Sequence, residues 1–119
     1  DIRENEDLEK KAKRLFHEAV DAANKNKMDL AMELAREALV FARYVKSPHR
    51  VFIHNFLAVL SLEKRNFAVA RYHTWQALQD LEGERGIIRD EKAYLTALQR
   101  EIEIHEKRHK EIEPIRLAC

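Results

Sequence analysis

Apolar residues recur at intervals of three and four through most of the chain, the spacing that places them on one face of an α-helix. Polar or turn-forming residues interrupt this pattern four times. The pattern therefore predicts an all-α protein with five helices, over about residues 5–25, 28–45, 48–64, 67–81 and 90–113.

The interruptions contain residues that commonly begin or end helices. Ser47 can cap a helix, and Pro48 suits a first helical position, where its missing N–H has no partner to lose. We expect Asn5 and Asn66 to be the N-caps of the helices that follow them. We expect Pro114 to end the last helix, because a proline lacks the N–H that the helix requires.

Several residues return after 39 positions. Ala19-Val20 recurs as Ala58-Val59, and Ala97-Leu98 follows at the same interval. Self-similarity with such a period is typical of stacked helical hairpins. We therefore expect one helical domain, residues 1–119, that holds two stacked antiparallel hairpins and a long closing helix. Their expected limits are about 5–45 and 48–82 for the hairpins and about 90–113 for the closing helix.

The helix over residues 48–64 is apolar around most of its circumference. A helix of this kind is expected to be central and buried. His54 lies within it, so we expect a hydrogen-bonded histidine at the edge of the core. No break occurs near residues 103–105, where a third hairpin would turn, so the last helix should close the stack alone.

Alanines occupy equivalent places in the two hairpins, and here the chain resembles tetratricopeptide repeats. That family has small residues at three contacts between helices, and Phe67 matches the aromatic residue that usually opens its second helix. The repeat is 39 residues rather than about 34, and Asn26 and Arg65 replace the glycine of the turn. The matching small residues are Ala19, Ala31 and Ala38, then Ala58, Ala70 and Ala77.

The resemblance implies a concave face on the first, third and fifth helices that binds an extended peptide. Two interpretations of this face remain open. It could be a partner-binding groove, or the three helices could bury its side chains against one another. Burial is favoured, because a large exposed apolar patch is a liability for a soluble monomer. The residues of the face are Phe16, Val20, Phe52, Asn55, Phe56, Val59, Tyr94 and Leu98.

Composition narrows the classes of partner. Hydrophobic residues make up 45% and charged residues 36% of the 119, which is typical of a globular protein. The 22 basic and 21 acidic residues nearly balance, so we expect binding neither to nucleic acid nor to membranes. The single Cys119 cannot form a disulfide framework. We expect a trimmed or excised soluble chain, cytoplasmic if it is natural.

Two short motifs resemble catalytic sites. His105, Glu106 and His109 match H-E-x-x-H, a zinc-binding pattern on a helix. However, Lys107 occupies a middle position, few residues remain to supply a third ligand, and the histidines continue an apolar stripe. We therefore expect adventitious metal binding at most. Arg100 and His105 have the R-x4-H spacing of HEPN-type ribonucleases, a spacing that chance also produces in a chain rich in arginine.

Three functional hypotheses follow. The favoured one is a designed or engineered helical scaffold without a natural ligand, a catalytic residue, a cofactor or a required partner. Interspersed charges and regular helix caps support it. The alternative is an excised tetratricopeptide-like module that binds a peptide or a helix. The most distant is a small all-α hydrolase that depends on metal or acts on RNA.

Overall fold

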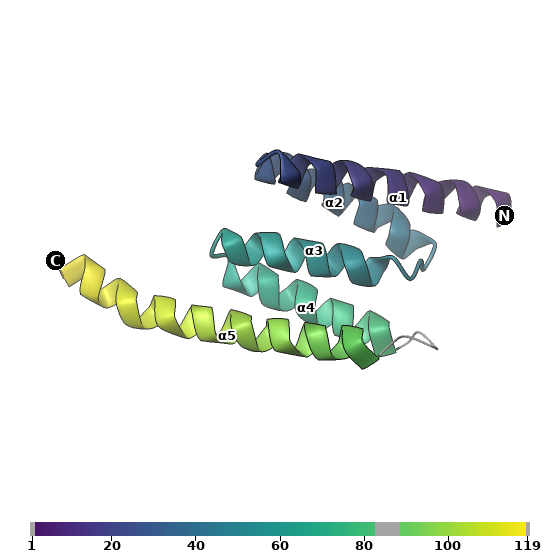
Figure 1. Cartoon of the computed structure of the whole chain (residues 1–119). Helices are drawn as coiled ribbons and strands as arrows, with labels where there is room; N and C mark the ends of the chain where they lie inside the picture. Colours follow the sequence, from purple (N-terminus) through teal and green to yellow (C-terminus); the bar gives the residue numbers. More distant parts are fainter. Residues whose placement is uncertain (1, 83–88, 119) are drawn as a thin grey trace.

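A computed structural model describes residues 2–82 and 89–118, with side chains described at 2–82, 92 and 95–112. All of the regular structure in these ranges is helical, which confirms the all-α prediction (Figure 1). The molecule measures 60 × 31 × 20 Å along its principal axes. The five helices are α1 (Ile2–Asn24), α2 (Met28–Tyr44), α3 (Arg50–Glu63), α4 (Phe67–Glu82) and α5 (Arg89–Ala118).

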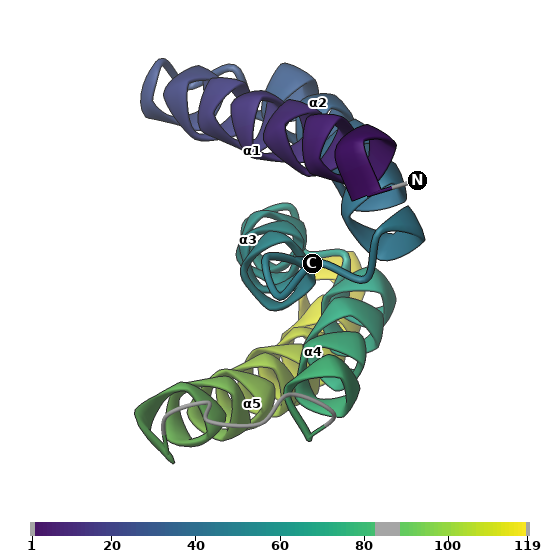
Figure 2. The ribbon, with the colours of Figure 1, turned by 90° about the vertical axis from the view of Figure 1, so that its right-hand side faces the viewer.

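Each helix packs mainly against its neighbours in the sequence. α1 with α2 and α3 with α4 form the two predicted hairpins, and α2 with α3 and α4 with α5 join them to each other and to the closing helix. Seen end-on, the helices follow an arc, with α1, α3 and α5 on its inner side and α2 and α4 on its outer side (Figure 2). The inner, concave side is therefore formed by alternate helices.

Small side chains lie at the helix contacts, as the repeat predicts. All six of the equivalent alanines have no solvent-exposed surface. Small residues let helix backbones approach closely, so these positions fix the spacing of the stack. Ala97, by contrast, is exposed, since its side of α5 has no neighbouring helix among the described residues. The buried alanines are Ala19, Ala31, Ala38, Ala58, Ala70 and Ala77.

Three tight turns share one geometry. Asn26, Lys46 and Arg65 have φ angles of 60°, 54° and 62°, which is the left-handed region. At each turn the left-handed residue donates its N–H to the carbonyl three residues earlier, and the next residue donates five residues back. This is the Schellman motif, which normally uses glycine at the left-handed position. Two of these residues are those that replace the turn glycine of the family pattern.

Several predicted helix limits are wrong, while the cap at Asn66 is confirmed by a 3.4 Å bond from the Val69 N–H to its Oδ1. α1 already begins at Ile2, so Asn5 lies inside it. α3 begins at Arg50 and not at Pro48, because Pro48 and His49 form a turn that leads into it. In this turn the Ser47 carbonyl accepts the Arg50 N–H and Ser47 Oγ accepts the His49 N–H, each at 3.2 Å.

Pro114 does not end α5, which continues to Ala118. A proline inside a helix removes only one hydrogen bond and crowds the carbonyl of the preceding turn. The residues after it include arginine, leucine and alanine, which have high helix propensity, so the backbone remains helical.

α3 is central and largely buried, as predicted, but one side of it is open. Ile53, Leu57 and Leu60 are buried against α1 and α2, and Ala58 against α4 and α5. Phe52, however, is 43% exposed on the remaining side, and Phe56 and Val59 are half-buried there. α3 is therefore central in the stack, but its concave side is open. Within the described residues, no helix is both long and apolar enough to cross a bilayer.

Candidate functional site

The concave face combines packed and open apolar side chains. The rings of Phe16 on α1 and Phe56 on α3 meet edge to face, with centroids 5.4 Å apart and an interplanar angle of 90°. Val20 and Val59 are half-buried on the same two helices. This part of the predicted face therefore belongs partly to the helix contact and partly to the surface.

Leu98, a residue of the predicted face on α5, does not line an open groove. Leu98 is 6% exposed and packs in the cluster formed with Ala58, Ala70 and Ile102. It is a core residue, because α5 packs against α4 at this point. The side chain of Tyr94 lies outside the described residues. Among the described side chains, the open part of the face is therefore on α1 and α3.

An apolar hollow of about 350 Å³ opens between α1 and the beginning of α3. The exposed ring of Phe52 forms one wall, and the buried Ile53 lies beneath it. Burial and the nearby Lys13 lower the pKa of His49, and Glu9 opposes this effect. Lys13 is the permanently charged residue among those that line the hollow. The hollow can hold one large apolar side chain. Its lining is Ala12, Lys13, Phe16, His17, His49, Phe52 and Ile53.

Asn55 lies on α3 between Phe52 and Phe56 in the sequence and is half-buried. Its Oδ1 is buried and has no hydrogen-bond partner among the described residues. Buried polar atoms in folded proteins are nearly always paired, and a missing bond costs about 1–3 kcal/mol. The Asn55 oxygen is therefore an unsatisfied acceptor that solvent does not reach.

The H-E-x-x-H residues are engaged in other contacts. Glu106 forms an ion pair with Arg71 of α4, and Lys110 approaches it at 3.5 Å. The hydrogen bond from Arg71 lowers the pKa of the Glu106 carboxyl group. The His109 ring lies 5.5 Å from that of Phe67, centroid to centroid. Among the described side chains, no three or more histidine, cysteine or carboxylate groups come together as a metal site.

Arg100 and His105 do not converge. Five positions along an α-helix correspond to a rotation of about 140°, so the two side chains leave α5 in different directions. Arg100 is exposed, and His105 Nε2 lies 3.7 Å from Glu101 Oε1. The ribonuclease-like spacing therefore does not produce a shared site within this chain.

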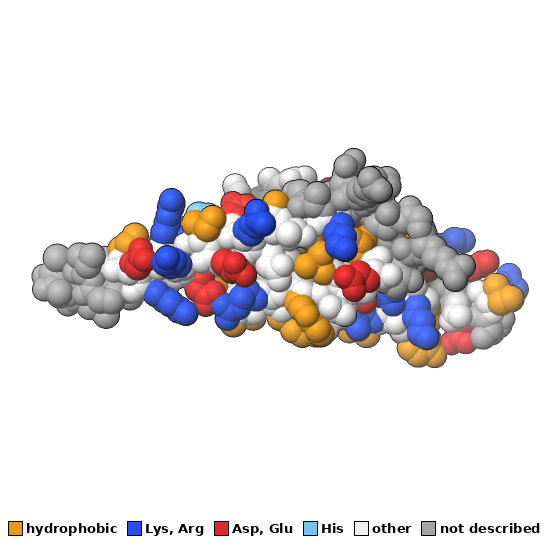
Figure 3. Space-filling view, turned by 90° about the horizontal axis from the view of Figure 1, so that it is seen from below, with side chains coloured by type: hydrophobic (Ala, Val, Ile, Leu, Met, Phe, Trp, Pro, Cys, Tyr) orange, Lys and Arg blue, Asp and Glu red, His pale blue; other side chains and the backbone are white. Residues whose placement is uncertain are grey.

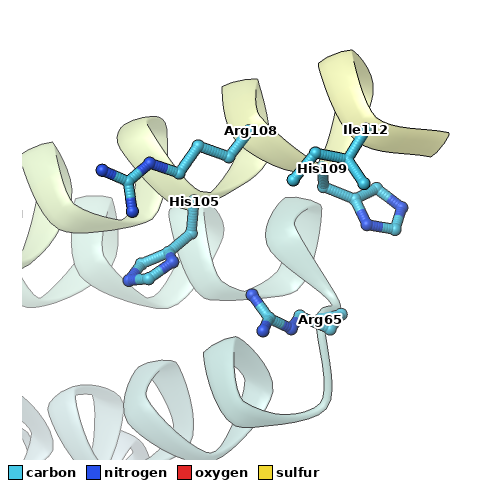
Figure 4. A pocket seen from close by; sticks show the side chains of 5 residues that line it. All are labelled: Arg65, His105, Arg108, His109 and Ile112. Carbon is cyan, nitrogen blue, oxygen red and sulfur yellow. The ribbon is translucent and has the colours of Figure 1, made fainter. Parts of the chain in front are cut away.

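A cluster of basic residues that we did not predict as a site surrounds a second hollow, of about 370 Å³ (Figure 4). We call it the cationic cleft and define it by its lining residues. Arg65 comes from the turn before α4, and the other residues come from α5. No motif predicts it, because Arg65 and His105 are 40 positions apart in the sequence. Its lining is Arg65, His105, Arg108, His109 and Ile112.

The cationic cleft is a local feature. On the face of the molecule seen from below, Lys and Arg side chains alternate with Asp and Glu side chains (Figure 3). An adjoining hollow of about 350 Å³ shares Arg65 and His105 but also includes the carboxylates of Glu63 and Glu101. Positive charge is therefore concentrated only on the side of the cleft toward Arg108.

A buried polar network joins α2, α3 and α4. His54, 1% exposed, lies with its Nδ1 3.0 Å from Nδ1 of His73, and Arg43 approaches its Nε2 at 3.1 Å. A guanidinium can only donate, so Nε2 of His54 accepts and its proton is on Nδ1, which donates to His73. Asp80 Oδ2 lies 3.4 Å from Arg43. The prediction of a hydrogen-bonded His54 is confirmed.

Burial lowers the pKa of His54 to about 3, with further contributions from His73, Arg43 and Arg50. Burial and Arg36 lower the pKa of His73 to about 4. Both imidazoles are therefore neutral near pH 7. This network is enclosed by three helices, so we regard it as structural.

Comparison with known proteins returned no match for this chain among protein-family models, curated proteins or solved structures.

Proposed function

We propose that the protein is a binding module that holds an extended peptide on the concave face of α1 and α3, in the manner of the tetratricopeptide repeats that it resembles. The observation that carries the proposal is the apolar hollow beside Phe52, whose ring is 43% exposed. An exposed aromatic residue that borders a hollow is a typical anchor point for a partner.

The lining of the hollow indicates the chemistry of the peptide. Its floor and walls suit a large apolar side chain, and Lys13 at the rim favours a carboxylate beside that side chain. The Oδ1 of Asn55 is buried and unpaired, so a rotation of this half-buried side chain toward the peptide would let it accept a hydrogen bond from a peptide N–H. In a helix most backbone N–H groups are already bonded, so an extended segment fits better. The ligand is therefore an extended segment with one large apolar residue next to Asp or Glu.

The turns also favour this proposal over a designed scaffold. Designed helical proteins usually have glycine at left-handed helix ends. Here Asn26, Lys46 and Arg65 occupy those positions. A binding module therefore explains both the exposed apolar hollow and the turns without glycine, whereas a designed scaffold explains neither.

The test is selection of a randomised nonapeptide display library on the immobilised protein, followed by fluorescence anisotropy with the enriched peptides. We expect enrichment of a large apolar residue flanked by Asp or Glu. We expect Phe52→Ala to weaken binding about tenfold and Asn55→Ala to weaken it severalfold.

Tyr72→Ala is the matched control, because Tyr72 is an exposed aromatic residue on α4 of the outer side. It should leave the affinity unchanged. Absence of enrichment would contradict the proposal and support the scaffold without a ligand. Equal binding to wild type and to Phe52→Ala would place the peptide elsewhere and contradict it too.

A further inference from the structure

The cationic cleft lies between two elements that the fold holds at a fixed spacing. Arg65 belongs to a Schellman turn, so its backbone is fixed by two hydrogen bonds. His109 of α5 contacts Phe67, the first residue of α4, and Arg71 of α4 pairs with Glu106 of α5. These contacts hold α5 beside the turn. The cleft is therefore a consequence of helix packing.

The charges that line the cleft have one sign. Arg65 and Arg108 are permanently charged, the other two polar lining residues are His105 and His109, and no carboxylate among the described side chains lines the cleft. Within the described part of the chain, neither Arg65 nor Arg108 forms an ion pair, whereas nearby Arg71 does. Figure 4 shows the Arg65 side chain extending toward His105 and the Arg108 side chain running back along α5, with His105 between the two guanidinium groups in this view. Both guanidinium groups therefore border the same hollow without an ion-pair partner among the described residues.

We propose that the cationic cleft binds a small phosphate monoester through the guanidinium groups of Arg65 and Arg108. A guanidinium presents paired donors that match the spacing of phosphate oxygens. The hollow of about 370 Å³ lies at the small end of the range of roughly 300–1,000 Å³ for ligand sites. It has room for an organic group as well as the phosphate, and Ile112 supplies an apolar wall for that group.

The acidic neighbours limit the affinity. Glu101 lies close to His105, and Glu63 lines the adjoining hollow. Both carboxylates repel an anion, so the complex should be weak and should weaken further as salt screens the arginines. Removal of the Glu101 charge should therefore strengthen binding, an effect that a purely structural role of these residues would not produce.

The test is a titration followed by amide chemical shifts in ¹H–¹⁵N spectra at low ionic strength, with phenyl phosphate, inorganic phosphate and benzoate as probes. We expect shifts confined to the amides of residues 65–66 and 105–112, and tighter binding of phenyl phosphate than of the other two probes. Glu101→Gln should tighten phenyl phosphate binding two- to threefold.

The variants Arg65→Asn and Arg108→Gln should each weaken phenyl phosphate binding about tenfold. Asn is chosen at position 65 because Asn26 occupies the equivalent turn, so the turn should be kept. Arg100→Ala, an exposed arginine elsewhere on α5, is the matched control and should change nothing.

Three outcomes would overturn the proposal: no shift, shifts spread over all exposed Lys and Arg residues, or unchanged binding in the Arg65→Asn/Arg108→Gln double variant. Tighter binding of a short single-stranded RNA than of phenyl phosphate would also overturn it. The site is separate from the peptide face, so Phe52→Ala should leave these shifts unchanged. Failure of one proposal therefore does not decide the other.

Discussion

The hydrogen bond between His54 and His73 joins α3 to α4 inside the protein. Both rings are neutral in the folded state, because burial lowers the pKa of His54 to about 3 and of His73 to about 4. Charged groups approach from each packed element, with Arg43 and Arg36 on α2, Arg50 on α3 and Asp80 on α4. Asp80 offsets part of this positive field, but burial and the arginines still disfavour a further proton on either ring.

This network predicts loss of stability in mild acid. In the unfolded chain both histidines bind protons near pH 6.5, whereas the folded chain takes them up only near pH 3–4. The unfolded state therefore binds more protons between these limits, and the free energy of unfolding falls as pH decreases from about 6.5. At pH 5 the loss should approach about 2 kcal/mol for each histidine. Urea unfolding at pH 7 and pH 5 measures it.

The double variant His54→Gln/His73→Gln should lose most of this pH dependence. The exposed His17→Gln serves as the control and should keep it. An equal fall in stability in the double variant and in wild type would show that other groups, chiefly carboxylates, cause the acid response.

At the scale of elements, the three Schellman turns determine how each helix leads into the next. Each uses a residue other than glycine in the left-handed region, where a side chain costs about 1–2 kcal/mol. Asn tolerates this conformation better than Lys or Arg. The turn at Lys46, between the two hairpins, therefore stores conformational strain that glycine would remove.

Lys46→Gly should raise the free energy of unfolding by about 0.5–1 kcal/mol, since relief of the left-handed conformation exceeds the added entropy of the unfolded chain. Thermal unfolding measures the change. Lys27→Gly is the matched control, because Lys27 follows a similar turn but has φ of −94°. It should be neutral or destabilising. A lower melting temperature for Lys46→Gly would contradict the argument.

The helices and their buried alanines were predictable because both depend on local periodicity. The helix ends at Asn5 and Pro114 were predicted wrongly. A capping residue or a proline only favours a helix end at a given position, and packing can move that end. The concave face was predictable as a set of residues but not as a surface. Whether Phe52 is exposed depends on how closely α1 and α5 approach α3, and no residue of α3 determines that.

The cationic cleft shows a second limit of the sequence. Arg65 and Arg108 are brought together only because α5 returns along α4 to the turn before it. Sequence motifs reveal sites whose residues are close together on one helix or loop. The residues of this cleft come from a turn and from α5, so no motif includes both.

At the scale of the whole molecule, the arc has contacts mainly between consecutive helices. Stability in such a stack is approximately a sum of units and interfaces between neighbours. α3 packs against α2 and α4, and its buried residues contribute to all three core clusters, whereas α1 and α5 each have one main neighbour. The centre should therefore be the most stable part.

Amide hydrogen exchange should be slowest in α3 and faster in α1 and in the second half of α5. End helices can detach while the centre stays folded, because detachment breaks only one interface. Exchange followed by NMR at neutral pH measures this gradient. Equal protection in α5 and α3 would contradict it and would indicate all-or-none unfolding.

The turns at Asn26 and Arg65 match in backbone geometry and lie one repeat length apart. The segment between them, which contains α2 and α3, is therefore preceded and followed by the same kind of turn. In a chain with a copy of that segment inserted after Asn66, the copied α2 would pack against α3, and the copied α3 would pack against α4. Evolution or an engineer could thus lengthen this protein by duplication alone, and its curvature would grow into a superhelix.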